Sequence, residues 1–279
     1  MGRNAATWVG FGAIALWATL AALTTLAERI PPLQLLAMCF AVGGAVGALR
    51  GLPRGVPPGA WALGVGGLFG YHLLYVLALR TAPAVEASLI AYLWPLLIVL
   101  LSALVDRLRW FHVAGATLGL AGAALIVAGG RGLSFDPAPG HGIALLAALV
   151  WAGYSVAQRR YAGVPTRAVA GFCLATAALA GAAHLVLETP VMPRGVEWLA
   201  ILVLGAGPVG AAFFLWDVGC KRGDLAVLGA ASYAAPLLST LLLVALGLAR
   251  PTVALALACL LITGGAALAA MGMWRRGDA

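Results

Sequence analysis

Ten apolar stretches follow one another along this chain, separated by short polar connections. Each is roughly 17–24 residues long, enough for a helix to cross a hydrocarbon core about 30 Å thick. Of the 279 residues, 63% are apolar and only 9% are charged, which is more apolar surface than a soluble core needs. The sequence therefore predicts an all-α, polytopic membrane protein with ten transmembrane helices. These lie at about residues 6–27, 33–49, 60–79, 83–105, 110–129, 141–160, 167–187, 197–220, 225–248 and 251–273.

One short motif occurs twice, 141 residues apart. Tyr92-Leu93-Trp94-Pro95 lies in the middle of one apolar stretch, and Tyr233-Ala234-Ala235-Pro236 lies in the middle of another. Each half of the chain holds five stretches, and because five is odd, the second half must enter the bilayer with the opposite orientation. We therefore expect two inverted five-helix repeats, residues 1–135 and 136–279, an architecture typical of secondary transporters.

The positive residues indicate how the helices are oriented. With the N-terminus inside, 12 of the 17 Lys and Arg residues fall on the inner side. Because cytoplasmic loops carry an excess of Lys and Arg, both termini are expected in the cytoplasm of a bacterial inner membrane. The net charge of +8 is thus a topology signal, and no nucleic-acid partner is expected. The five residues on the outer side are Arg29, Arg80, Arg131, Arg194 and Arg250.

Two features of the chain have a structural interpretation. The first apolar run, residues 5–27, is longer than the hydrophobic region of a signal peptide, so we interpret it as a retained helix. The cysteines lie in different stretches without a C-x-x-C pair, which is typical of small buried apolar residues. No metal site, redox site or cofactor is expected. The cysteines are Cys39, Cys173, Cys220 and Cys259.

Three tryptophans lie near the centres of their predicted helices: Trp17, Trp94 and Trp151. Tryptophan prefers the membrane interface, where the indole N–H finds a polar partner. Each one alone favours dense helix packing. Together, and next to mid-helix prolines, they favour the wall of a cavity.

Two stripes of polar and aromatic residues share helix faces with these tryptophans. Tyr154, Ser155 and Gln158 follow Trp151 at positions i+3, i+4 and i+7, so this face of the sixth helix contacts protein or water. In the third helix, three neighbours within one turn also share a face. They are Tyr71, His72 and Tyr75. As an ionisable group near the midplane, His72 either bonds a backbone carbonyl or contacts a substrate or proton.

Prolines interrupt three of the predicted helices. Pro95 and Pro236 remove a backbone hydrogen bond and free the carbonyls near Ala91 and Ser232, which a ligand or water could use. Pro208 predicts a further kink near the centre of the eighth helix. These kinks serve either packing alone or, because two of them recur at matching positions, the substrate site.

Two carboxylates lie near the ends of predicted helices. Asp217 is four residues before Lys221, the spacing of a helical ion pair. Glu86 lies near the outer end of its helix, close to Arg80 in sequence, and a structural ion pair is expected there as well. Either acid could instead be a gate or a coupling site.

These residues resemble the drug/metabolite transporter superfamily, specifically the EamA-type ten-helix exporters built from two five-helix repeats. Within it, Tyr92-Leu93-Trp94-Pro95 together with Tyr71-His72 is similar to the bacterial aromatic amino-acid exporters. A departure follows the ninth helix, where residues 246–250 carry no acid to match Asp106. The resemblance covers residues 6–273, and its other carriers are Trp17-Ala18, Trp151-Ala152, Pro83, Pro95-Leu96, Asp106-x-Leu108, Gly115, Gly119 and Gly122.

The resemblance and the midplane aromatic group together predict an inner-membrane exporter of aromatic and other large neutral amino acids that works by alternating access. The expected partners are the amino-acid substrate and the lipid bilayer, and a monomer is plausible. Proton coupling is left open. The expected substrate-binding residues are Trp17, Tyr71, His72, Tyr75, Tyr92, Trp94, Trp151, Tyr154, Ser155, Gln158 and Tyr233.

Three alternatives stay open from the sequence. The first is export of another metabolite, such as a lipophilic cation, a nucleoside or a thiol; the lack of a midplane carboxylate argues against a dedicated cation site. The second is an intramembrane hydrolase with Ser155 as nucleophile and His72 or His184 as base, but no glycine follows Ser155. We therefore do not expect an enzyme. The third is a scaffold subunit, which predicts no aqueous cavity.

Overall fold

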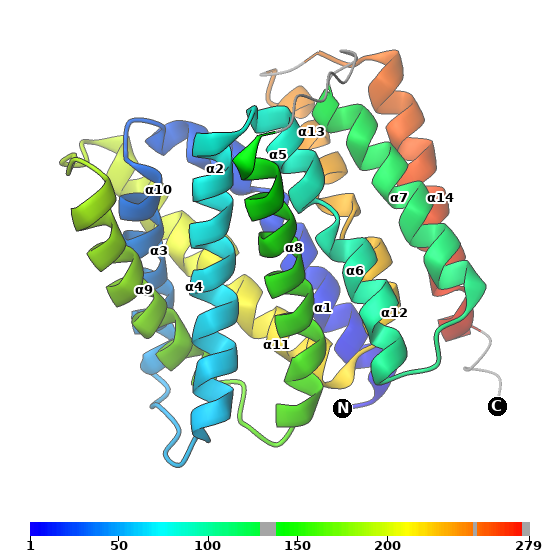
Figure 1. Cartoon of the computed structure of the whole chain (residues 1–279), viewed down its shortest axis with the longest axis horizontal. Coiled ribbons are helices and arrows are strands. Elements are labelled where there is room, and N and C mark those ends of the chain that lie inside the picture. The colour runs from blue at the N-terminus through cyan, green and yellow to red at the C-terminus, as the bar shows by residue number, and fades with distance from the viewer. Residues whose placement is uncertain (129–137, 248–249, 275–279) are drawn as a thin grey trace.

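The computed structural model describes residues 1–128, 138–247 and 250–274, which form a helical bundle (Figure 1). Within these residues ten spans cross the bundle, which confirms the predicted all-α fold. The first five spans are α1 (Arg3–Trp17) with α2 (Leu20–Thr24) and η1 (Thr25–Ala27); α3 (Pro32–Ala48); α4 (Pro58–Thr81); α5 (Ala84–Ala91) with α6 (Trp94–Leu101) and η2 (Ser102–Leu104); and α7 (Trp110–Ala128).

The last five spans are α8 (Pro139–Ala157) with η3 (Gln158–Tyr161); α9 (Ala168–Leu187); α10 (Val196–Ala206), η4 (Gly207–Ala211) and α11 (Ala212–Arg222); α12 (Leu225–Ala231) with α13 (Ala234–Ala245); and α14 (Val253–Trp274). The predicted boundary between the repeats, at residues 135 and 136, lies outside the described residues, as does Arg131. We call these spans 1 to 10 in chain order.

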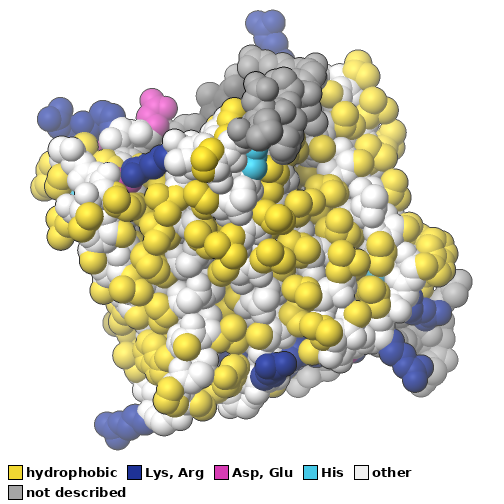
Figure 2. Space-filling model, in the orientation of Figure 1, with side chains coloured by type: hydrophobic (Ala, Val, Ile, Leu, Met, Phe, Trp, Pro, Cys, Tyr) yellow, Lys and Arg dark blue, Asp and Glu magenta, His cyan; other side chains and the backbone are white. Residues whose placement is uncertain are grey.

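The chain begins and α14 ends at the same end of the bundle, the lower end in Figure 1. We call this end the terminus face and the other end the opposite face. On the face shown in Figure 2, apolar side chains cover the middle of the molecule, Lys and Arg gather at the two ends, and the visible Asp and Glu lie at the upper end. Nine spans are long and apolar enough to cross a membrane, and α3 is a shorter apolar helix, again counting only described residues. This pattern is that of a multi-pass membrane protein.

Spans 4 and 9 break where the repeated motif places its proline. Span 4 leaves the helix at Tyr92 and resumes at Trp94, and span 9 breaks at Ser232 and Tyr233, because Pro95 and Pro236 have no N–H to donate. The Tyr233 hydroxyl accepts a hydrogen bond from the Leu96 N–H at 3.2 Å. It thereby satisfies one of the orphan donors at the start of α6.

Two further interruptions occur in spans 1 and 8. Pro208 lies in η4, a π-helical turn that separates α10 from α11. Span 1 breaks at Ala18 and Thr19, between α1 and α2. Nothing in the sequence predicted this second break, because the segment has neither proline nor glycine.

Each helix of the first half packs against a helix of the second half. The closest pairs are α7 with α14, α3 with α9, α4 with α8 and α1 with α11. Small residues allow this approach. A Cβ atom on Gly43 would lie 2.7 Å from both the Gly205 carbonyl oxygen and the Gly210 Cα, so only glycine fits there. The described helices thus form a bundle whose centre belongs to both halves.

Candidate functional site

A cavity of about 790 Å³ occupies the centre of the bundle and extends toward the opposite face. Its mouth includes Thr24 and Glu28, whose side chains are exposed. The wall between is mostly apolar, with side chains from spans 1, 2, 3, 4, 5, 6, 8 and 9. Seven of the expected substrate-binding residues line it: Trp17, Tyr71, His72, Tyr75, Tyr92, Trp94 and Trp151.

Tryptophans form the floor of this cavity. The ring centroids of Trp17, Trp94 and Trp151 are 5.9–6.3 Å apart, in edge-to-face geometry. Trp216 lies beneath them, 5.1 Å from the Trp17 ring, and its side chain is fully buried. Each edge-to-face pair of aromatic rings stabilises the fold in addition to the stability gained by burying the rings. The floor separates the cavity from the terminus face.

The indole N–H groups explain how the floor is fixed in place. Trp17 Nε1 donates to the Pro208 carbonyl at 3.1 Å, so the π-helical turn supplies an acceptor in the middle of the bundle. Trp216 Nε1 donates to the Ser155 hydroxyl at 3.1 Å. Both bonds cross from one span to another, and they orient the rings that a substrate would contact.

His72 is held in one tautomer by the helix in which it lies. Its Nδ1 is 2.7 Å from the Leu68 carbonyl oxygen, and because a carbonyl only accepts, Nδ1 must carry the proton. The neutral ring then presents Nε2 as an acceptor. The ring packs edge-on against Phe40 and Phe213. His72 therefore bonds a backbone carbonyl and also lines the cavity, so both interpretations made from the sequence describe part of its environment.

Tyrosines supply the polar groups of the wall. The rings of Tyr71 and Tyr75 stack 6.0 Å apart and nearly parallel, and the Tyr75 hydroxyl lies 3.1 Å from Ser88 Oγ. Tyr92 lines the same wall from the break in span 4. A flat ring could therefore stack between aromatic faces while hydroxyl groups bind its polar end.

Four expected residues lie outside this lining: Tyr154, Ser155, Gln158 and Tyr233. Ser155 and Tyr233 are fully buried, and their hydroxyls accept the Trp216 and Leu96 N–H groups. Tyr154 and Gln158 line a second, much smaller pocket toward the terminus face. Trp151, Tyr154, Ser155 and Gln158 were predicted to form one face of the sixth helix. They extend along two turns of that helix, so they lie at different depths in the bundle. The Ser232 carbonyl, expected to be free, accepts the Ala235 N–H.

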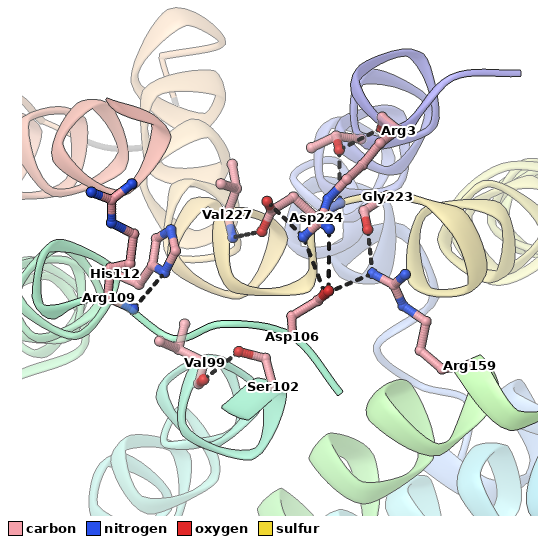
Figure 3. Close-up of polar contacts among 11 residues, drawn as sticks. Arg3, Val99, Ser102, Asp106, Arg109, His112, Arg159, Gly223, Asp224 and Val227 are labelled. Atoms are coloured by element: carbon pink, nitrogen blue, oxygen red, sulfur yellow. Dashed lines mark hydrogen bonds and ion pairs between the residues drawn. The ribbon is translucent and has the colours of Figure 1, made fainter. Parts of the chain in front are cut away.

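Charged residues join four spans at the terminus face (Figure 3). The two terminal guanidinium nitrogens of Arg3 each lie 3.1 Å from an oxygen of the Asp106 carboxylate, and Nη2 also lies 2.9 Å from Asp224. Arg159 bonds Asp106 at 3.2 Å and also donates to the Gly223 carbonyl. We call Arg3, Asp106, Arg159 and Asp224 the terminus network. Each member lies at the end of a span that also lines the cavity: spans 1, 4, 6 and 9.

The sequence did not predict the terminus network. Arg3 and Arg159 were counted only as topology signals, Asp106 was noted only for the family resemblance, and Asp224 was not noted. Arg3 is 103 residues from Asp106 and 221 residues from Asp224, so local spacing has no information about the contact. The usable signal was the presence of opposite charges at span ends on the same predicted side.

The predicted ion pairs need one correction. Asp217 and Lys221 do pair, at 2.8 Å, and both are buried. Glu86 does not pair with Arg80; its carboxylate lies 2.8 Å from His141, and Arg80 pairs with Glu188 at 2.6 Å. The chain turns at Ala82 and Pro83, so Glu86 faces α8 whereas Arg80 faces α9.

At the opposite face the carboxylates fasten helices along the rim of the bundle. Glu188 also accepts the N–H groups of Leu33 and Gln34 at the start of α3, at 3.1 and 3.2 Å. Glu197 binds Arg29 at 2.8 Å. Within the described ranges no three His, Cys, Asp or Glu side chains are grouped as metal ligands would be. The geometry is that of an organic-molecule cavity open at one end.

The sequence matches the EamA-like transporter family twice, over residues 4–128 and 138–271. The chain is 54% identical to the aromatic amino acid exporter YddG of Ancylobacter novellus, across 97% of this chain and 99% of that protein. The protein of the same name in Escherichia coli K12 is 28% identical, across 87% and 88% of the two chains.

A third relative and a solved structure agree with these matches. The aromatic amino acid exporter YddG of Salmonella typhimurium is 27% identical over 87% of this chain and 88% of its own length. A crystal structure of a protein with 54% sequence identity superposes with a TM-score of 0.93, covering 97% of this chain and 99% of that one. The chain is a member of the EamA-like transporter family.

Proposed function

We propose that this protein exports aromatic amino acids, and other large neutral ones, across a bacterial inner membrane. The observation that carries the proposal is the floor of three tryptophans, Trp17, Trp94 and Trp151, at the closed end of a cavity of about 790 Å³. Such a cavity is large enough for a single-ring or two-ring amino acid. The names of three relatives, two of them distant in sequence, support the same substrate class.

The wall offers partners for both parts of such a substrate. The side-chain ring would stack against the tryptophans and Tyr71. The α-ammonium group would donate to Nε2 of His72, which is an acceptor because Nδ1 is already bonded to Leu68. The carboxylate would accept from the hydroxyl groups of the wall. Transport then needs no covalent chemistry, no cofactor and no second subunit.

Alternating access would follow from the two halves of the chain. We propose that residues 1–135 and 136–279 are inverted repeats that rock about the cavity, which lies at their interface. The conformation described here is open at the opposite face. The distribution of Lys and Arg supports a cytoplasmic terminus face, so this would be the state that releases substrate outside.

The test is uptake of radiolabelled phenylalanine, tryptophan and alanine into liposomes that contain the purified protein, with and without a pH gradient. We expect saturable flux of phenylalanine and tryptophan, and its loss in the Trp151→Ala and His72→Ala variants. Equal flux in these variants would remove the cavity from the mechanism. Flux of none of the three would overturn the substrate class and direct the search to other metabolites.

A further inference from the structure

A second pocket lies between the central cavity and the terminus face. Apolar residues of spans 3 and 7 form part of its wall, and spans 6 and 8 contribute the polar residues Tyr154, Gln158, Asp217 and Lys221. Its volume is about 10 Å³, close to the least that can hold one water molecule. Tyr154 lies between the second pocket and the central cavity, because its ring centroid is 5.3 Å from that of Trp151 in the cavity floor.

The pocket contains a buried ion pair. Asp217 and Lys221 are 2.8 Å apart, with side chains only 2% and 5% exposed. Asp217 also accepts from the Thr166 hydroxyl at 2.7 Å, and Lys221 also donates to the Val164 carbonyl at 2.9 Å. Ionisable residues within a membrane-spanning bundle are expensive and usually mark the path of a substrate or ion. A purely structural link between these spans could be apolar at similar or lower cost.

Gln158 gives independent evidence that the second pocket binds a ligand. The side chain is 4% exposed, it lines the pocket, and its Nε2 is buried without a hydrogen-bond partner among the described residues. A buried donor without an acceptor destabilises the fold, so its presence indicates an acceptor that arrives in another state. Lys221 lines the same pocket, and its ammonium group favours an acceptor that carries negative charge.

We propose that this pocket is a second substrate site, which binds the zwitterionic head group of an α-amino acid when the terminus face is open. The inference rests on the proposed function. Asp217 receives the α-ammonium group, and Lys221 together with Gln158 receives the α-carboxylate. In the conformation described here, Asp217 and Lys221 bind one another and the pocket is collapsed.

The packing around the pocket shows what must move. Glycines of α4 face aromatic side chains of spans 6 and 7: Gly64 lies against Phe172 and Gly67 against Tyr154. At Gly64 an added Cβ would come within 2.6 Å of the Phe172 ring, so no space is left between the helices. A shift of α4 away from these rings would widen the pocket and join it to the central cavity.

The test replaces the unpartnered donor and measures transport from each face. Gln158→Met keeps the length of the side chain but removes the N–H groups, and Gln158→Leu is a second variant of the same kind. Vesicles of known sidedness, established with an N-terminal tag, report the KM for phenylalanine at each face. The matched control is Thr176→Val, because Thr176 is also buried and unpartnered but lines neither pocket.

We expect Gln158→Met to raise the KM from the terminus face about tenfold, the loss of a hydrogen bond to a charged group, without lowering the Tm. The KM from the opposite face should stay the same. Phenethylamine, which lacks the carboxylate, should inhibit the variant and the wild type equally from the terminus face. Thr176→Val should leave both KM values unchanged.

Two results would overturn the proposal, and they can be told apart. If wild-type protein moves phenylalanine but both Gln158 variants keep the wild-type KM at the terminus face, the second site is wrong and the proposed function stands. If wild-type protein moves no phenylalanine from either face, the proposed function fails and the zwitterion site fails with it.

Discussion

The two ends of the bundle use the same kind of interaction with opposite consequences. At the terminus face Arg3, Asp106, Arg159 and Asp224 join spans 1, 4, 6 and 9, four of the spans that line the cavity. At the opposite face Arg80 pairs with Glu188 between spans 3 and 7, along the rim of the bundle. Ion pairs across the centre close one end, and ion pairs along the rim leave the other end open.

The repeated motif shows the same asymmetry at a single residue. Tyr92 lines the open cavity, whereas its counterpart Tyr233 is fully buried and holds the start of α6 through the Leu96 N–H. Equivalent sequence positions thus have different roles in one conformation. An inverted repeat that alternates between two states would exchange these roles.

Breaking the terminus network should have the largest effect on which end of the bundle is open. Asp106→Ala removes the carboxylate that holds both Arg3 and Arg159, and we expect it to shift the population toward a terminus-open state about tenfold or more. Two thiols introduced separately into a variant without native cysteines measure this: Ala226→Cys at the closed end and Ser239→Cys in the open cavity.

Labelling with a water-soluble maleimide should then become faster at position 226 and slower at position 239. The control is Glu188→Ala, which breaks a rim pair and should change neither rate in this sense. Unchanged labelling at position 226 in Asp106→Ala would mean that the network only supports the fold.

A change in the tryptophan floor, which lies between the two ends, should have the second-largest effect. Trp17→Phe keeps an aromatic ring beneath the cavity but loses the hydrogen bond to the Pro208 carbonyl, worth about 0.5–1.5 kcal/mol. We expect phenylalanine transport to fall roughly three- to tenfold. Trp94→Phe is the matched control, since among the described residues the Trp94 indole makes ring contacts but no hydrogen bond, and it should have a smaller effect. Equal effects would show that ring size matters and the bond does not.

The fold was more predictable from the sequence than the site. Membrane-length apolar stretches and repeated prolines follow directly from local composition, so ten spans and the breaks at Pro95 and Pro236 could be expected. Helix periodicity placed Trp151 and Gln158 on one face but could not show that Trp151 belongs to the floor of the cavity whereas Gln158 lines the second pocket. The terminus network was missed because its contacts join residues far apart in the chain.

A comparison of the two equivalent tyrosines should have an intermediate effect. Tyr233→Phe removes the hydroxyl that accepts from Leu96, so we expect a lower Tm and a loss of about 1 kcal/mol in the free energy of unfolding. Tyr92→Phe should leave the Tm unchanged and raise the KM for phenylalanine, since Tyr92 lines the cavity. Thermal unfolding in detergent and uptake in liposomes measure the two quantities. The same changes of Tm and KM in both variants would contradict the different roles of Tyr92 and Tyr233.

The rim pair between Arg29 and Glu197 should have the smallest effect. The hydrogen bond and charge of Glu197 raise the pKa of Arg29 above its ordinary value. A raised pKa contributes stability that is fully present below the ordinary pKa of an arginine and is lost only as the pH rises through the raised pKa of the folded state. Between pH 5 and pH 9 the guanidinium therefore stays charged, and transport by the Arg29→Gln variant should follow the wild-type pH profile with no measurable loss. If this variant instead changes labelling at the Ser239→Cys thiol, rim pairs also control the opposite mouth, and the distinction between central and peripheral ion pairs fails.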